Sequence, residues 1–238
     1  MKIQFSSLSY LQNWKTRFVY FVLIPMIDLL LLVLINAQYT NNLNWSVAVA
    51  TIVLSGGTLS MNSMSQLFVM DRTLRIDREM VVNRPFSPDY WVSKILTSAI
   101  AGLVLIMINL IILGILQAPY FLLIRALIMT PLIICSGIIV GFLGAIAAWE
   151  NSNPYFYMNL IGSLTTIVSG ALVLVEKYPL WLRTISHFFP FSQTIQFVVT
   201  GSGHIYWDAI VDLFWLLLGI ICYKVKIHRI LKNQAQLW

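Results

Sequence analysis

Charged residues are scarce in this chain of 238 residues. Only 10% of the residues are Asp, Glu, Lys or Arg, whereas 59% are hydrophobic. A soluble domain has about a quarter charged residues and about half apolar ones, and the mean hydropathy here is +0.82. The shortage of charge therefore excludes an ordinary water-soluble fold and predicts a protein whose solvent is lipid.

Cysteine, metal-binding clusters and nucleotide-binding loops are also lacking. The two cysteines, Cys135 and Cys222, lie in apolar runs, so we interpret them as small buried hydrophobic residues. The sequence contains no HExxH motif, no Walker A loop and no clustered Cys and His residues. These absences predict a chain that binds neither a metal nor a cofactor and hydrolyses no nucleotide itself.

A serine hydrolase is the catalytic alternative that the sequence raises. Ser202 and His204 lie two residues apart in a Gly-rich turn. A serine nucleophile needs a base that is itself oriented by a third group, and no acid is evidently positioned here. The Gly-x-Ser-x-Gly elbow is absent as well. The sequence therefore argues against this function.

Long apolar runs dominate the sequence. A membrane-spanning helix needs about 20 predominantly apolar residues. We predict an all-α membrane protein with six transmembrane helices, at Phe18–Asn36, Val47–Val69, Ile95–Leu116, Ala126–Ala148, Phe156–Val175 and Tyr206–Tyr223. The intervening segments are too short for a separate soluble domain, so we expect residues 1–238 to form a single transmembrane domain.

The basic residues predict the orientation of these helices. With the N-terminus inside, 12 of the 15 basic residues lie on the inner side, and only Arg125, Lys177 and Arg183 lie outside. The positive-inside rule therefore predicts a multi-pass protein with both termini in the cytoplasm. The net charge of +6 fits this placement better than it fits binding to nucleic acid.

Residues 1–17 predict a helix in the membrane interface. Four apolar residues share one face of a helical wheel, namely Ile3, Tyr10, Leu11 and Trp14. Polar and basic residues lie opposite, where they would meet anionic headgroups. An ordinary charged flank is the alternative.

The inner segment 71–94 holds nine of the chain's 24 charged residues. Asp71, Arg75 and Glu79 follow one another at intervals of four, which favours a helix, and Pro85 ends it. A charged helix across the inner mouth of two spans suits docking to another protein. A solvated positive-inside loop is the alternative.

The residues after Pro85 predict a second helix start. We expect Ser87 to be the N-cap, Pro88 the first helical residue and Asp89 an acidic residue of the first turn. This helix leads into the third span.

The outer segment 176–203 is too apolar for a loop in water. Two prolines divide it into pieces of about ten residues, each too short to cross a membrane. We predict two short outer helices, near Pro179–Phe188 and Ser192–Thr200, that cover the external leaflet. An interfacial amphipathic loop is the alternative. The residues that we expect to define this lid are Pro179, Trp181, Phe189 and Pro190.

Few polar side chains of note lie within the predicted spans. Asp28 lies midway along the first, where a carboxylate normally faces protein or water, and we favour a structural hydrogen bond over contact with cargo. Asn62 and Gln66 belong to a second span rich in small and polar residues, which favours helix packing over a cargo site. Asp208 and Asp212 are expected to border an outer vestibule.

The order of these parts resembles the permeases of type-2 ATP-binding-cassette (ABC) exporters. Arg75–Lys94 is similar to the charged helix, proline and third-span start of that family. Ser169-Gly170, Pro179–Arg183 and Phe189–Gln196 are similar to its outer lid. The resemblance covers nearly the whole chain.

The resemblance implies a function and partners. Two permeases, identical or related, would form a pathway in a bacterial plasma membrane, surrounded by membrane lipid. Separate cytoplasmic ATPase subunits would use ATP and magnesium to drive export of an amphipathic drug, peptide or lipid-like cargo. An ATP-independent immunity protein that sequesters a membrane-active peptide is the alternative. The residues expected to couple to the ATPase are Arg75, Asp77, Arg78, Glu79 and Arg84.

Overall fold

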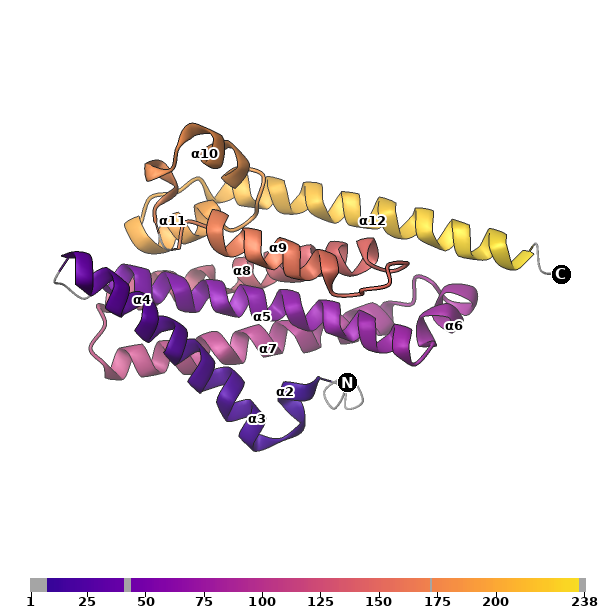
Figure 1. Ribbon diagram of the computed structural model, residues 1–238, viewed down its shortest axis with the longest axis horizontal. Coiled ribbons are helices and arrows are strands. Elements are labelled where there is room, and N and C mark those ends of the chain that lie inside the picture. The colour runs from indigo at the N-terminus through magenta and orange to yellow at the C-terminus, as the bar shows by residue number, and fades with distance from the viewer. Residues whose placement is uncertain (1–7, 41–43, 172, 236–238) are drawn as a thin grey trace.

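The computed structural model describes residues 8–40, 44–171 and 173–235. Figure 1 shows long helices gathered in an elongated bundle, with short helices near its two ends. The elements in chain order are α2 (Ser9–Gln12), α3 (Trp14–Phe18), η1 (Val19–Leu23), α4 (Ile24–Thr40), α5 (Trp45–Thr73), α6 (Ile76–Asn83), α7 (Pro88–Ile115), α8 (Tyr120–Ala147), α9 (Phe156–Val168), η2 (Val175–Lys177), α10 (Leu180–Ser186), α11 (Ser192–Thr200) and α12 (Ile205–Ala235).

Four helices of the described residues are long and apolar enough to cross a membrane, namely α5, α7, α8 and α12. They correspond to the predicted second, third, fourth and sixth spans. The chain is therefore an all-helical protein of membrane-spanning character. The complete set of six spans stays a prediction.

The other two predicted spans have different helix lengths from those expected. The first is divided: α3 leads into the π-helical segment η1, and the α-helix that follows, α4, has 17 residues. On α7, the Asn109 amide donates to the carbonyl of Phe21 within η1, over 2.8 Å. The fifth is α9, which has 13 residues and ends at Val168 rather than Val175. Gly170 follows in the left-handed conformation, with φ of 80°, so the helix does not continue.

The predicted N-terminal interfacial helix is broken. Asn13 is extended and separates α2 from α3, so the expected single apolar face does not form. Tyr10 and Leu11 are buried against the bundle, whereas Trp14 is 70% exposed. The Tyr10 hydroxyl hydrogen-bonds Ser63 of α5, and burial raises the pKa of Tyr10 to about 12. Ile3 lies outside the described residues.

Helix α5 forms the centre of the bundle because small residues let its neighbours approach closely. A Cβ at Gly102 of α7 would lie 2.6 Å from the Gly56 carbonyl oxygen. A Cβ at Gly137 of α8 would lie 2.2 Å from the Gly57 carbonyl oxygen, and one at Gly141 would lie 2.4 Å from that of Met61. Glycines of α7 and α8, with Gly56 and Gly57 of the second predicted span, therefore serve helix packing. A packing role for the polar residues of that span stays a prediction.

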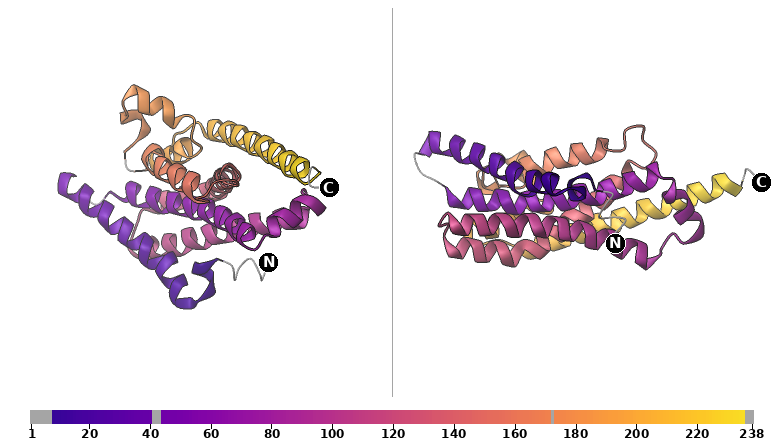
Figure 2. Two further views of the ribbon diagram at one scale, coloured as in Figure 1. Left: turned by 45° about the vertical axis from the view of Figure 1, so that its right-hand side comes forward. Right: turned by 90° about the horizontal axis from the view of Figure 1, so that it is seen from below.

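The short helices near one end differ in their surroundings. Helix α11 has the predicted bounds and packs between α5, α8 and α12, with Ile195 and Val198 fully buried. Helix α10 packs against α9 and carries Trp181, which is 65% exposed. Figure 2 shows the opposite end, where α6 and the C-terminal part of α12 lie far from α10. The bundle thus has an α6 end and an α10 end.

Candidate functional site at the α6 end

The segment predicted as one coupling helix is a helical hairpin. Helix α5 continues through Asp71 and Arg72 to Thr73, and α6 begins only at Ile76. Arg75 interrupts the helix because its backbone is left-handed, with φ of 58°. The prediction that this helix starts at Asp71 was therefore wrong, because α6 starts at Ile76. The predicted N-terminus of the next helix is confirmed, since α7 has Ser87 at the N-cap and Pro88 first.

A buried ion pair ties the two stems of this hairpin together. The Lys94 ammonium of α7 lies 2.7 Å from a carboxylate oxygen of Asp71 on α5, and the lysine side chain is fully buried. The same ammonium donates to the Leu67 carbonyl over 2.9 Å, and the Tyr90 hydroxyl donates to Asp71 over 2.5 Å. Lys94 also lies over the ring of Phe68, 4.9 Å from its centroid.

An aromatic cluster joins the hairpin to α8 and α12. Tyr223 of α12 donates to the carbonyl of Pro85 over 2.7 Å, just before α7 begins. Its ring lies 5.1 Å from that of Trp91 and 5.8 Å from that of Phe86, measured between centroids. Trp91 in turn packs edge-on against Phe142 of α8, at 5.2 Å. A displacement of the hairpin would therefore be transmitted through these rings to α7, α8 and α12.

Two further contacts anchor this end of the bundle. Arg72 of α5 donates to the carbonyls of Ala148 and Asn151, which follow α8. Lys226 of α12 pairs with Glu150 at 2.5 Å. The hydrogen bond from Lys226 lowers the pKa of the Glu150 carboxyl. Both contacts place a cation near the C-terminus of α8, where the helix dipole is negative.

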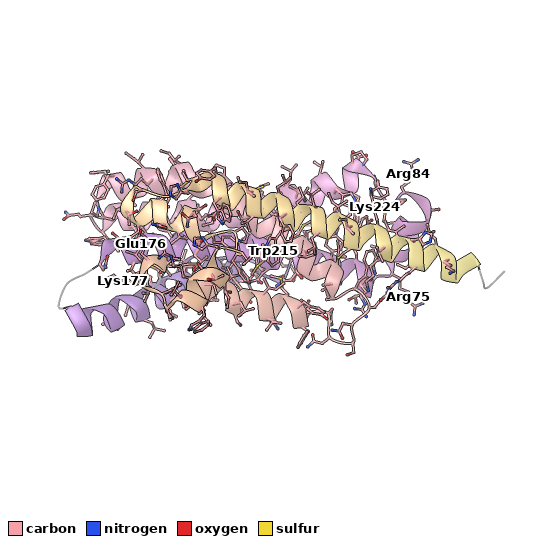
Figure 3. The ribbon with its side chains drawn as sticks, turned by 90° about the horizontal axis from the view of Figure 1, so that it is seen from above. Arg75, Arg84, Glu176, Lys177, Trp215 and Lys224 are labelled. Atoms are coloured by element: carbon pink, nitrogen blue, oxygen red, sulfur yellow. The ribbon has the colours of Figure 1, made fainter. Side chains whose placement is uncertain are left out.

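Three of the five predicted coupling residues are exposed on the outside of the hairpin. Arg75, Glu79 and Arg84 are exposed, and Figure 3 shows Arg75 and Arg84 at the same end of the molecule. Asp77 and Arg78 belong to α6, but their side chains lie outside what the structure describes. Asp71, four residues before Arg75, binds Lys94 of α7.

A polar groove of about 380 Å³ lies between α5 and α9. The side chains that line it are Thr58, Met61, Asn62, Met158, Asn159, Gly162, Ser163 and Thr166. Of the three polar residues expected inside the spans, Asn62 lines this groove, whereas Asp28 and Gln66 do not. Asp28 is exposed on α4 instead. Such a concentration of hydroxyls and amides is unusual beside a helix of membrane-spanning character such as α5.

The predicted lid residues divide between surface and core. Pro179 is the N-cap of α10, and Trp181 projects from that helix. Pro190 is buried, and the Phe189 ring lies 5.6 Å from that of Trp215 on α12. The four residues therefore differ in exposure, and their joint role in an outer lid stays a prediction.

Two carboxylates expected to border a vestibule are buried instead. Asp208 accepts hydrogen bonds from the backbone amides of Gln193 and Thr194, at the start of α11. Asp208, a residue of α12, therefore caps the N-terminus of α11. Asp212 accepts a hydrogen bond of 2.6 Å from Ser136 of α8. Cys135, expected to be buried, is exposed.

Ser202 and His204, the pair considered and disfavoured as a hydrolase dyad, contact other residues. The Ser202 hydroxyl lies 3.0 Å from that of Thr200, and the His204 ring lies 5.5 Å from that of Tyr206. Among the described residues, no three His, Cys, Asp or Glu side chains gather to hold a metal ion.

Sequence reasoning identified the charged segment but missed both its hairpin form and the contacts that fasten it. Lys94 was taken only as the end of the charged segment, and Tyr223 only as the end of the last span. The available signal was a lysine at the start of the long apolar part of α7, since such a charge needs a partner. Comparison of the chain with protein-family models, characterised proteins and solved structures gave no match. Its function therefore has to be inferred from this geometry.

Proposed function

We propose that this chain is the permease subunit of an ATP-driven exporter of the type-2 ABC class. The observation that carries the proposal is the α5–α6–α7 hairpin. Its stems are fastened by the ion pair between Asp71 and Lys94, while Arg75, Glu79 and Arg84 remain exposed at its tip. A fastened hairpin with a charged tip transmits an external force to the long helices rather than yielding locally.

The partner that fits this tip is a cytoplasmic ATPase subunit, which binds ATP and magnesium itself. Closure of two such subunits pushes α6 toward the membrane. The push reaches α12 through the bond between Pro85 and Tyr223, and it reaches α8 through Trp91 and Phe142. The helices then tilt together because the aromatic cluster packs them as one unit.

The polar groove between α5 and α9 supports a half-pathway. An unsatisfied amide in hydrocarbon costs several kcal/mol, and Asn62 and Asn159 are both exposed along this groove. Water or a second permease copy removes that cost. We therefore place the pathway where two such grooves face each other, with an amphipathic cargo between them.

Charge reversal tests the docking step. A fourfold variant (Arg75→Glu, Asp77→Lys, Arg78→Glu and Glu79→Lys) should insert normally into the membrane but should lose the ATPase subunit on co-purification from the native host. The matched control is Glu176→Lys with Lys177→Glu, because these exposed residues lie at the opposite end (Figure 3). An ATPase subunit retained equally by both variants would contradict the proposal.

The competing function is ATP-independent sequestration of a membrane-active peptide. The exposed apolar surface of α10, with Leu180 at 84% and Trp181 at 65%, favours it as a second candidate. Resistance to such a peptide in cells that contain this chain and no cognate ATPase would support sequestration over export.

A further inference from the structure

An apolar groove of about 450 Å³ lies between α7, α8 and α12, toward the α6 end. Its lining is apolar except for the Tyr223 hydroxyl, the Trp91 indole N–H and the Cys135 thiol. Met64, Ile138 and Phe142 are buried at its floor, whereas Ile95 and Cys135 are exposed at its rim. The groove therefore opens sideways from the bundle, toward the lipid.

The groove exists because α7 and α12 pack against α8 and make few contacts with each other. The aromatic cluster bridges them, where the Trp91 and Tyr223 rings meet at 5.1 Å. From Cys135 to Phe142 the α8 wall extends about 10 Å, at about 1.5 Å per residue. This length is about two thirds of a leaflet, given a hydrocarbon core of about 30 Å. A linear alkyl chain fits such a slot.

Two basic residues lie close in sequence to lining residues at the α6 end of the groove, Arg84 near Phe86 and Lys224 next to Tyr223. Arg84 precedes Pro85, Lys224 follows Tyr223, and the Tyr223 hydroxyl bonds the Pro85 carbonyl over 2.7 Å. Arg84 and Lys224 are both exposed, and Figure 3 shows them at the same end of the molecule, beside α12. Successive residues of a helix are about 100° apart, so Asp89 lies on a different face of α7 from Trp91 and Ile95, which line the groove. Its carboxylate therefore does not offset the charges of Arg84 and Lys224 at the groove.

We infer that this groove binds one acyl chain of an anionic phospholipid, whose phosphate lies between Arg84 and Lys224. The apolar slot takes the chain, since its volume lies in the range of about 300–1,000 Å³ typical of ligand sites. The two cations select the headgroup, because basic residues beside a membrane attract anionic lipids. The bound chain occupies the space between α7 and α12. This inference needs no ATPase, although it shares Arg84 with the charged tip of the proposed export function.

Lipid retention tests the acyl chain. Purified protein is exposed to equal amounts of phosphatidylglycerol and phosphatidylcholine with identical acyl chains, washed, and examined by native mass spectrometry. The wild-type chain should retain phosphatidylglycerol in preference to phosphatidylcholine. Ile139→Trp, which fills the groove, should lower the retained lipid about tenfold, a loss of about 1.4 kcal/mol. Ile128→Trp is the matched control, because Ile128 is an exposed residue of α8 that does not line this groove.

A second variant keeps the test decisive if Ile139→Trp does not fold. Cys135 lies at the exposed rim, so Cys135→Trp should block the slot without repacking the core. Wild-type lipid retention by a folded Cys135→Trp chain would overturn the inference.

Headgroup selection is tested separately. Arg84→Gln combined with Lys224→Gln should abolish the preference for phosphatidylglycerol while lipid is still retained. Arg75→Gln should keep the preference, because Arg75 lies on the other edge of the same end in Figure 3. A preference that survives the double change would overturn the assignment of the phosphate to these cations.

Discussion

Lys94 of α7 crosses to Asp71 of α5, and their charged atoms lie 2.7 Å apart with the lysine fully buried. The 22 residues between them include all of α6. Because the pair fastens both stems at the base of the hairpin, α6 cannot move independently of α5 and α7. In the proposed function, this ion pair is the contact through which a push on α6 reaches α5 and α7.

Removing Lys94 should loosen the hairpin. Lys94→Met leaves Asp71 without its counter-charge, and breaking a buried pair in this way costs about 3–5 kcal/mol. The free energy of unfolding in detergent should fall by this amount. Adding Asp71→Asn should restore part of the loss, since no unpaired charge remains. A single variant as stable as wild type would show that the pair does not fasten the hairpin.

Close packing of α8 on α5 should be sensitive to a single methyl group. A Cβ at Gly141 would lie 2.4 Å from the Met61 carbonyl oxygen, whereas the nearest atom at Gly144 would be 3.6 Å away. Gly141→Ala should therefore cost about 1–3 kcal/mol through overpacking. Gly144→Ala should be neutral or slightly stabilising, because alanine favours a helix by up to about 1 kcal/mol. Denaturant titration of both variants in the same detergent measures the contrast, and equal effects would contradict it.

Asp208 should stabilise the helical structure of α11. Asp208→Ala removes two backbone hydrogen bonds and one to the Thr194 hydroxyl. A hydrogen bond to a charged group contributes about 1.5–3 kcal/mol, so the amides of 192–200 should exchange faster with deuterium. Asp89→Ala, an exposed first-turn aspartate of α7, is the control and should leave α11 unchanged. Unaltered exchange in Asp208→Ala would mean that α11 is held by packing alone.

The ion pair between Glu150 and Lys226 should give a small acid-sensitive contribution to stability. Because Lys226 lowers the pKa of Glu150 below its ordinary value of 4.5, the contribution is present above that value. It is lost as the pH falls through the lowered pKa. The difference in melting temperature between wild type and Glu150→Gln should therefore be present at pH 7 and vanish in acid. A difference that persists unchanged in acid would point to a cause other than ionisation.

Local sequence signals predicted several elements correctly. Ser87, Pro88 and Asp89 begin α7 as their residue types require, and α11 has the bounds set by Pro190 and Gly201. In each case a residue with restricted or permissive backbone geometry marks the boundary. Such signals act over a few residues, so the sequence alone reveals them.

Where contacts between residues distant in sequence decide the structure, predictions from local sequence patterns were wrong. The spacing of Asp71 and Arg75 favoured a continuous helix, but Asp71 bonds Lys94 and Tyr90, and the helix breaks at Arg75. Cys135 was expected in the core, yet the separation of α7 and α12 exposes it. Which residues meet across helices depends on packing, and the periodicity of one helix does not encode it.

Photo-crosslinking from α6 tests docking to an ATPase most directly. Ile76 is the first residue of α6 and is 38% exposed, so a photoreactive amino acid there should crosslink, in native cells, to a cytoplasmic protein with a Walker A motif. The same amino acid at Trp181 of α10, at the opposite end, should not. Crosslinks from position 76 to lipid or to other copies of this chain alone, with no ATPase captured, would contradict the proposed function.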